Sequence, residues 1–484
     1  MTGFHPYNKI QAPGKSMKEN AESFRKVVRK AISGGADFGD LFHEKREDCR
    51  ITVATASDLV TSFGYTEGTA LRLIKDGSSR SVHLELPDEG ELMLAAEMLR
   101  AEAYPGTHDV AQRQDFKKGP AGGEKRKNRK RSGHGFDASL QYASPVREIA
   151  LEAESLLKKI VREAFAYSIS ASFYRQMVGI MNIEEEYVED TREAALFKIE
   201  VSEGTGQDHV SFDLSYGFPS AERMVQDLRT EDVKSHLIRA YMKRRNAVSV
   251  PKGDVALVLA PGSGGVFFHE AVGHVFEADS PLLKRFWAES QNFHMGASLS
   301  VYDDPAAMER GGYIFDDEGV KGRKKAIIED GRFVNFLDNV LTARKTGKIP
   351  LGNGRRKSFR DIPLPRLSAI FIGPGEDDPE SIVKSTEKGL YASRFGSAFL
   401  DESSGDFYIN LTEGNIIDRG KMGPSIREVV IKGNAFKIFR SIDRIGNDLS
   451  FDKTGLVCSK SGQALPSSVG APTMRVASIL VFPE

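Results

Sequence analysis

The sequence predicts an α+β protein with two domains, in which N-terminal helices pack on a mostly antiparallel sheet and a mostly β C-terminal domain follows. Two observations predict this class. The chain has 484 residues, more than one compact core usually supports. Short strand-like segments separated by turn residues dominate both halves, and helices are few in the second. We expect the domains to span residues 1–247 and 248–484.

The N-terminal domain begins with an amphipathic helix. Apolar residues recur at helical intervals from Phe24 to Ile32, and Gly34 ends the element. Ser16 and Glu19 precede it with the spacing of a capping box. This helix is expected to pack on the sheet that follows.

Four strand-like segments come next and predict a meander: DLFHEKRE, CRITVATAS, TALRLIKDG and RSVHLEL. Turn residues such as Asp76-Gly77 separate them. A second helix is predicted near residues 88–103. A third begins at Ser144-Pro145 and carries an apolar stripe that ends at Val161.

Residues 105–143 interrupt this pattern, because glycine and charged residues replace apolar ones there, and we expect a flexible basic loop. Its cations between 117 and 131 face one acid, Glu124: Lys117, Lys118, Lys125, Arg126, Lys127, Arg129, Lys130 and Arg131. Such a stretch can bind nucleic acid or an acidic partner. However, no aromatic residue is interleaved and the whole chain carries a formal charge of −1, so a solvated loop is favoured over nucleic-acid binding.

Strand-like segments resume between residues 168 and 217, and AERMVQDLRTEDVKSHLIRAYMKRR predicts one long helix before the domain boundary. Two hairpins are predicted beyond it. AIIEDGRFVNFL would close at Asp330-Gly331, and REVVIKGNAFKIF would close at Gly433-Asn434.

Composition excludes several classes of protein. Hydrophobic residues make up 40% of the chain, and 67 basic residues nearly balance 68 acidic ones, as in ordinary globular proteins. No stretch of about 18 residues lacks charge, and the N-terminus lacks the apolar core of a secretory signal. Only two cysteines occur, Cys49 and Cys458. We therefore expect a cytoplasmic protein without a disulfide framework and without a membrane partner.

A metal-binding motif follows the boundary. Residues 255–260 predict a buried strand, PGSGG a turn, and FFHEAVGHVFEAD a helix that carries His269, Glu270 and His274. Histidines four residues apart share one face of a helix, but these are five apart, or about 140° around the axis. Sharing one ion therefore requires a local rearrangement, such as a π-bulge near Gly273. Without it, the two histidines simply pack or form hydrogen bonds.

A hydrolytic zinc site needs a third protein ligand and one open position. Cys458 is the leading candidate, because thiolate binds zinc strongly and the residue lies in the turn-rich stretch GLVCSKSGQALPSSVGAP. A lone cysteine is also often a small buried hydrophobe. Glu277 and His294 are weaker candidates, and Cys49, in a strand-like segment, is expected to pack in a core.

Four blocks resemble the TldD/PmbA metalloproteases, in the TldD branch that keeps its metal motif: FHEAVGHVFEAD, FDDEGVKGRKKAIIEDGRFVNFLDN, GNGRRKSFRDIPLPR and CSKSGQALPSSVGAPT. The resemblance covers nearly the whole chain. It implies a zinc peptidase of two α/β domains in which His269, His274 and Cys458 hold Zn²⁺ and Glu270 is the catalytic base. It also implies a dimer, with a homologous PmbA/TldE-like sister subunit or with itself, around a cleft for unfolded peptides. Ser459 departs from the glycine expected after the metal cysteine.

These observations lead to one main hypothesis and one alternative. The main hypothesis is zinc-dependent hydrolysis of unfolded or modified peptides and peptide precursors, with the peptide held by strand addition to a sheet edge. The alternative is a non-catalytic peptide-binding or scaffolding subunit with a structural metal. Glu270 argues against the alternative, because a structural zinc needs no base.

Three other motifs are weaker signals. Arg355 and Arg356 in GNGRRKSFR could position a substrate carboxylate, although a surface turn is the default interpretation. Asp316-Asp317-Glu318 could bind a second cation, but such a cluster is more often a surface turn. PGSGG lacks the lysine of a phosphate-binding loop, so its glycines indicate a tight strand-to-helix turn.

Overall fold

The computed structural model describes residues 20–55, 57–102, 141–161, 165–184, 186–204, 210–290 and 299–483. The predicted capping box at Ser16 and Glu19, nearly all of the predicted basic loop, and His294 lie outside the described residues.

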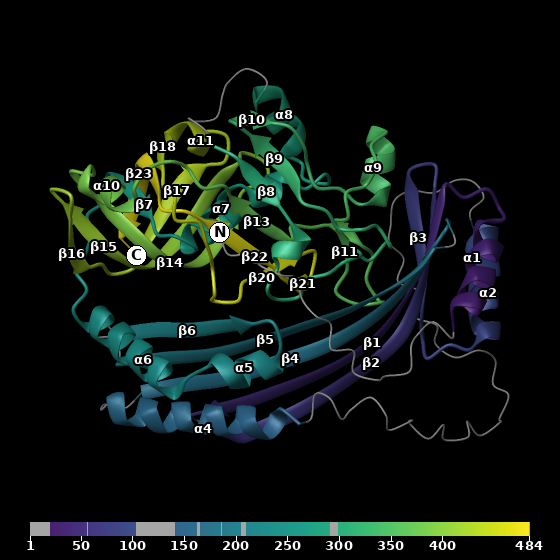
Figure 1. The fold of residues 1–484 in the computed structure, drawn as a ribbon, viewed down its shortest axis with the longest axis horizontal. Helices are drawn as coiled ribbons and strands as arrows, with labels where there is room; N and C mark the ends of the chain where they lie inside the picture. The colour runs from purple at the N-terminus through teal and green to yellow at the C-terminus, as the bar shows by residue number, and fades with distance from the viewer. Residues whose placement is uncertain are drawn as a thin grey trace, which may run out of the picture.

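The N-terminal half is built on one six-stranded antiparallel sheet with the order β3-β2-β1-β4-β5-β6 (Figure 1). Its strands are β1 (Phe38–Ala54), β2 (Ser57–Lys75), β3 (Ser78–Glu85), β4 (Phe165–Asn182), β5 (Tyr187–Glu203) and β6 (Val210–Phe218). The predicted antiparallel sheet is therefore confirmed. The Asp76-Gly77 turn joins β2 to β3, with both residues at positive φ (50° and 72°), as a two-residue hairpin turn requires.

One prediction about these strands is wrong. DLFHEKRE and the first six residues of CRITVATAS do not form two short strands but belong to the single 17-residue strand β1. β1 pairs with β2 on one side and with β4 on the other, and the β4 register runs from Asp40↔Asn182 to Ala54↔Ser168. Pairing on both sides satisfies the backbone of the polar middle segment and keeps it extended.

The described residues of this half form five helices beside the sheet: α1 (Ala21–Ile32), α2 (Glu89–Glu102), α4 (Ala143–Ile160), α5 (Ala221–Asp227) and α6 (Thr230–Arg245). Figure 1 shows α4, with α5 next to it, on the face turned away from the C-terminal half, α1 with α2 at one end of the sheet, and α6 at the other end, where Lys243 and Arg244 bind Glu413 and Glu428 of the C-terminal half. α4 begins one residue before Ser144. The single long helix predicted before the boundary is wrong, because Leu228 and Arg229 adopt extended backbone between α5 and α6.

The C-terminal half contains a closed barrel. Strands β14 (Lys388–Leu400), β7 (Gly253–Leu259), β23 (Met474–Pro483), β17 (Val429–Asn434) and β15 (Asp406–Asp418) pair in this order, and β15 pairs back with β14. β16 (Lys421–Ser425) and β18 (Ile442–Ile445) attach to this ring.

A second sheet has the order β10-β9-β8-β13-β22-β19. Its strands are β8 (Val301–Asp303), β9 (Lys325–Glu329), β10 (Arg332–Phe333), β13 (Ala369–Ile372), β19 (Ser450–Phe451) and β22 (Ser468–Ala471). Two small ribbons pair β11 (Gly354–Arg355) with β12 (Leu364–Pro365) and β20 (Val457–Lys460) with β21 (Gln463–Pro466). The mostly β character predicted for this half is confirmed.

Short helices complete the C-terminal half: α7 (Ser263–Ala271), the 3₁₀ turns η3 (Gly273–Phe276) and η4 (Pro305–Ala307), α8 (Leu283–Ser290), α9 (Val340–Thr346), α10 (Pro379–Lys384) and α11 (Ile438–Ser441). α7 contacts strands of both the barrel and the second sheet, and its Phe267 and Phe268 belong to their shared hydrophobic core. The metal motif is thus anchored in the hydrophobic core that the barrel and the second sheet share.

The two predicted hairpins have different outcomes. β9 and β10 form the hairpin closed by Asp330 and Gly331, both at positive φ. The hairpin predicted at Gly433-Asn434 is wrong, because β17 pairs with β15 and β23 and the chain leaves it toward α11. A glycine-asparagine turn signal has no effect where longer-range pairing already satisfies the strand.

A buried network of ion pairs joins the two halves. Arg72 of β2 donates to Asp40 and to Glu318, both at 2.7 Å. Arg356 also donates to Asp40, at 3.1 Å, and Arg192 of β5 donates to Asp317. Because these groups are almost fully buried, each charge depends on its partners, and the network fixes how the sheet meets the C-terminal half.

This network overturns the surface-turn interpretation of two motifs. Asp316, Asp317 and Glu318 are buried rather than exposed. Arg355 binds Asp317 at 3.2 Å, and Arg356 is occupied as described above. These arginines therefore balance buried carboxylates and do not present a free guanidinium to a substrate carboxylate.

Candidate metal centre

The PGSGG segment makes a tight turn from β7 into α7. Gly262 has φ = 78°, a conformation that favours glycine, and a Cβ on Gly265 would lie 2.6 Å from the backbone nitrogen of Gly470. The prediction that these glycines serve a strand-to-helix turn is confirmed. The close approach seats α7 against β22 and places the buried His269 on the side of the β20–β21 ribbon.

The α-helix ends two residues after His269, and this break brings the histidines together. Val272 leaves helical geometry at φ = −144°, and residues 273–276 then form one 3₁₀ turn. The ring centroids of His269 and His274 lie 4.7 Å apart. The rearrangement that the five-residue spacing requires is therefore present, but as a helix break with a 3₁₀ turn and not as the expected π-bulge.

Cys458 approaches the histidines from β20. Its Sγ lies 3.5 Å from Nε2 of His274, and the donor atoms of Cys458, His269 and His274 all lie within 4.8 Å of one another. Arg366 holds the β20–β21 ribbon in place by donating to the carbonyl oxygens of Cys458 (2.6 Å) and Gln463 (2.9 Å).

The electrostatics of this triad suit a metal ion. Burial would raise the pKa of the Cys458 thiol, but His269 and His274 outweigh it and lower the pKa to about 5. Nε2 of the fully buried His269 has no hydrogen-bond partner, although buried polar atoms are nearly always paired. A thiolate and two imidazoles form a donor set typical of zinc. Within the described residues, this is the one group of such side chains close enough to share an ion.

Glu277 holds His274 from the side opposite Cys458. Its Oε2 accepts from Nδ1 of His274 at 3.0 Å and from Nζ of Lys460 at 2.9 Å, and its Oε1 accepts from the backbone of Leu367. Burial would raise the pKa of Glu277, but His274 and Lys460 lower it to about 2. Glu277 therefore orients His274, and both of its carboxylate oxygens are already occupied by other partners. Its position three residues after His274 is the only sequence signal of this role.

Glu270 lies between the triad and an open space. Its Oε1 accepts from Nδ1 of His269 at 3.1 Å, and a quarter of its side chain is exposed. Burial would raise the pKa of Glu270, but the hydrogen bond and charge of His269 lower it, so the group is a carboxylate. The carboxylate borders a cavity of about 540 Å³.

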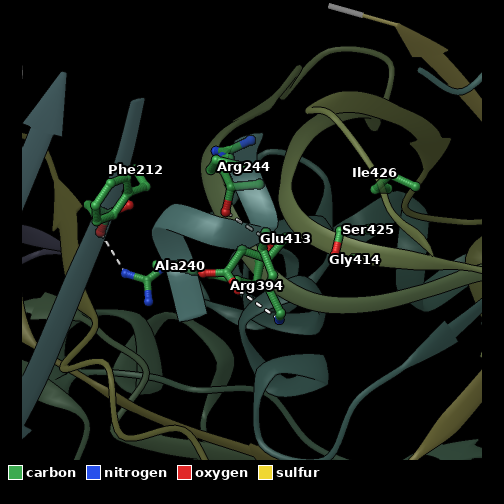
Figure 2. A pocket seen from close by; sticks show the side chains of 11 residues that line it. Phe212, Ala240, Arg244, Arg394, Glu413, Gly414, Ser425 and Ile426 are labelled. Atoms are coloured by element: carbon green, nitrogen blue, oxygen red, sulfur yellow. Dashed lines mark hydrogen bonds and ion pairs between the residues drawn. The ribbon is translucent and has the colours of Figure 1, made fainter. Parts of the chain in front are cut away.

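This cavity, called here the Glu270 cavity, lies between the two halves of the protein. Its walls come from β6, α6, α7, β14, β15 and the loop between β19 and β20. A narrow pocket next to it shares residues with it, and Figure 2 labels Arg394, Glu413 and Ala240 of α6 among the residues that line this pocket. Sequence reasoning did not find this cavity, because its walls come from distant parts of the chain.

One wall of the Glu270 cavity is a sheet edge. β6 is the last strand of its sheet, and its residues 213–216 line the cavity. The backbone nitrogen of Gly217 donates to Lys453 and so points away from β5. Because this direction alternates along an antiparallel strand, the backbone groups of Ser215 and Asp213 also point away from β5.

Two further site predictions remain. Cys49 is buried in β1, as expected, and burial raises the pKa of its thiol to about 11. His294, a weaker ligand candidate, lies outside the described residues.

Comparison with known proteins agrees with this geometry. Residues 252–482 match the PmbA/TldA metallopeptidase C-terminal domain. A metalloprotease TldD homolog from Buchnera aphidicola is 31% identical over 50% of this chain and 51% of its own length. A zinc metalloprotease TldD homolog from Saccharolobus solfataricus is 24% identical over 94% of this chain and 99% of its own length. The chain thus spans about half the length of the Buchnera relative.

The fold has close counterparts among solved structures. The crystal structure of TldE from Thermococcus kodakarensis superposes with a TM-score of 0.71, covering 95% of this chain and 100% of that one at 16% identity. At such identity the likeness concerns the fold. The C-terminal domain match and the TldD homologs show that this chain belongs to the TldD/PmbA family.

Proposed function

We propose that the protein is a zinc-dependent peptidase that hydrolyses unfolded or modified peptides and peptide precursors. One observation carries this proposal: a His269–His274–Cys458 donor set lies beside a carboxylate, Glu270, that borders a cavity. Three protein ligands would leave one coordination position open, as in catalytic zinc sites. The metalloprotease names of the relatives support the same activity.

In this proposal, a zinc ion held by these ligands supplies a Lewis acid that acidifies water and polarises a peptide carbonyl. Glu270 accepts a proton on its carboxylate and passes it to the leaving amine. Its exposure toward the cavity and its ionised state suit both steps. Glu277 keeps the proton of His274 on Nδ1, which leaves Nε2 free as a ligand atom.

The edge of β6 supports binding of extended peptides. A strand added beside Asp213 and Ser215 would form main-chain hydrogen bonds inside the Glu270 cavity. Such bonds do not depend on side chains, so the proposed peptidase accepts many sequences that are unfolded enough to extend.

The setting of the enzyme is also part of the proposal. We propose domains of residues 1–247 and 248–484, a dimer with a TldE-like sister subunit or with itself, and a cytoplasmic location. The likeness to TldE supports the partner, and two buried free cysteines support a reducing compartment. Within the described ranges, no helix is long and apolar enough to cross a membrane.

The test is the substitution Glu270→Gln, which keeps the shape of the side chain and removes its base. We expect one zinc per chain to be retained, while hydrolysis of an unstructured peptide falls by about 10²–10⁴-fold. Glu289→Gln, in the neighbouring helix α8, is the matched control and should behave as the parent. Metal content, solution mass and turnover are measured with and without a TldE-like subunit. Parental turnover in Glu270→Gln would exclude Glu270 as the base, and peptide binding without turnover in the parent would favour a scaffold.

A further inference from the structure

Two cations in the walls of the Glu270 cavity lack an anionic partner. Arg239 comes from α6 and Lys453 from the loop between β19 and β20. Both are exposed, and neither forms an ion pair within the described part of the chain. On α6, His236, Arg239, Ala240 and Lys243 recur at helical spacing and share the face that borders the cavity.

The carboxylates of the same walls are already engaged. Asp213 accepts from Arg394 at 2.6 Å, and Glu413 accepts from Lys243 at 3.3 Å. Asp452 accepts from the backbone and the hydroxyl of Thr454.

The remaining carboxylate is Glu270, which lies against His269 and serves as the base in the proposed function. The lining therefore holds four carboxylates and four cations, and Arg239 and Lys453 are the two of these cations that no carboxylate of the described walls binds. Cations in a recess attract anionic groups, and an arginine binds a carboxylate with two parallel hydrogen bonds.

The position of Lys453 relates these charges to a bound peptide. Its carbonyl oxygen accepts from the backbone of Gly217, so the Lys453 loop occupies the sheet edge directly after Ser215. A strand added to β6 would therefore meet Lys453 at this end. Arg239 borders the same cavity from α6, where Ala240 is adjacent to it.

We propose that Arg239 and Lys453 bind a carboxylate of the substrate, so that the enzyme prefers peptides carrying a C-terminal carboxylate or an acidic side chain near the cleaved bond. This inference rests on the proposed peptidase function and adds a substrate class to it.

The experiment uses three unstructured peptides of one neutral sequence: one amidated at its C-terminus, one with a free C-terminus, and one amidated with a single glutamate. Both kcat/KM with the parent and Kd with Glu270→Gln are measured for each peptide. We expect at least one carboxylate peptide to be favoured about tenfold over the neutral amide, the effect of one charge-assisted hydrogen bond. The preference should shrink as salt is raised, because these charges are partly solvated.

The double variant R239A/K453A should abolish this preference, so that the variant treats all three peptides alike. Lys234→Ala, an exposed lysine of α6 outside the cavity walls, is the matched control and should keep the preference. Preference for the free terminus alone identifies a terminal carboxylate, and preference for the glutamate peptide alone identifies an acidic side chain.

If the parent gives equal kcat/KM values and Glu270→Gln gives equal Kd values for all three peptides, the inference is overturned while the peptidase proposal stays intact. A preference that survives R239A/K453A would overturn it as well. If the parent cleaves none of the peptides, the proposed function fails, and the Kd values still decide whether the two cations bind a carboxylate.

Discussion

Replacing Glu277 by glutamine tests whether a buried carboxylate positions the metal site. Oε2 of Glu277 accepts from His274 and Lys460, at 3.0 and 2.9 Å, while Oε1 accepts from the backbone of Leu367 at 3.2 Å. A glutamine side chain has the same shape but only one accepting oxygen. Whichever way its amide turns, at least one of these buried donors faces an NH₂ group. The substitution should therefore destabilise the fold by about 1–3 kcal/mol.

The effect on zinc should be larger than this loss of stability alone suggests. Removing a carboxylate that orients a histidine ligand typically costs about 10- to 100-fold in metal affinity, or roughly 1.4–2.7 kcal/mol. Zinc affinity is measured by competition with a chelator, and stability by denaturation of the metal-free protein. The metal-free measurement separates weaker ligand orientation from weaker folding.

Asp279→Asn is the matched control for this experiment. Asp279 also binds Lys460, but its side chain is 30% exposed. Within the described part of the chain, Asp279 forms no hydrogen bond with His274. We expect Asp279→Asn to change zinc affinity by less than about threefold, the scale of an exposed ion pair. Equal losses in both variants would refute the role assigned to Glu277, because they would show that only Lys460 or general stability matters.

Two further predictions concern Cys458 as the proposed third zinc ligand and the stability of the protein at acidic pH. Cys458→Ala should lower zinc affinity by about 100-fold or more, because one of the three proposed ligands is lost, whereas the buried Cys49→Ala should not. Similar affinities in the two variants would show that the third ligand is misassigned. Burial, opposed by Glu67 and assisted by Lys45, lowers the pKa of His43 from 6.5 to about 4, so the unfolded chain binds a proton that the folded chain does not. The contribution of this group to the free energy of unfolding is complete above pH 6.5 and falls toward pH 4. Denaturant titration should show about 2 kcal/mol lost between pH 7 and 5, and His43→Gln should remove that part of the loss. An unchanged difference between the two pH values in His43→Gln would contradict the assignment.

Local signals predicted much of the fold correctly. Helical spacing from Phe24 to Ile32 produced α1, and Asp-Gly pairs produced the turns at residues 76–77 and 330–331. These elements follow from short-range backbone preferences, which the surrounding structure does not oppose. Local signals failed where long-range pairing competes with them, as in the uninterrupted strand β1 and at Gly433.

The residues of the candidate site were predicted from sequence, but their arrangement was not. His269, Glu270 and His274 were visible as a motif, and Cys458 was selected as the leading thiol. The five-residue spacing predicted a local rearrangement near Gly273, but the predicted π-bulge was the wrong form of it, because the helix break at Val272 depends on how residues 273–276 pack after α7 ends.

The sequence by itself determined the α+β class, the metal-ligand residue types, and the resemblance to a metalloprotease family. Only the tertiary structure decided that Glu277 orients His274, that Asp317 and Arg356 lie in a buried network, and that β6 borders a cavity beside Glu270. The physical reason is separation along the chain. Backbone preferences and motif spacing act over a few residues, whereas burial, ion pairing and cavity walls arise when segments hundreds of residues apart come into contact.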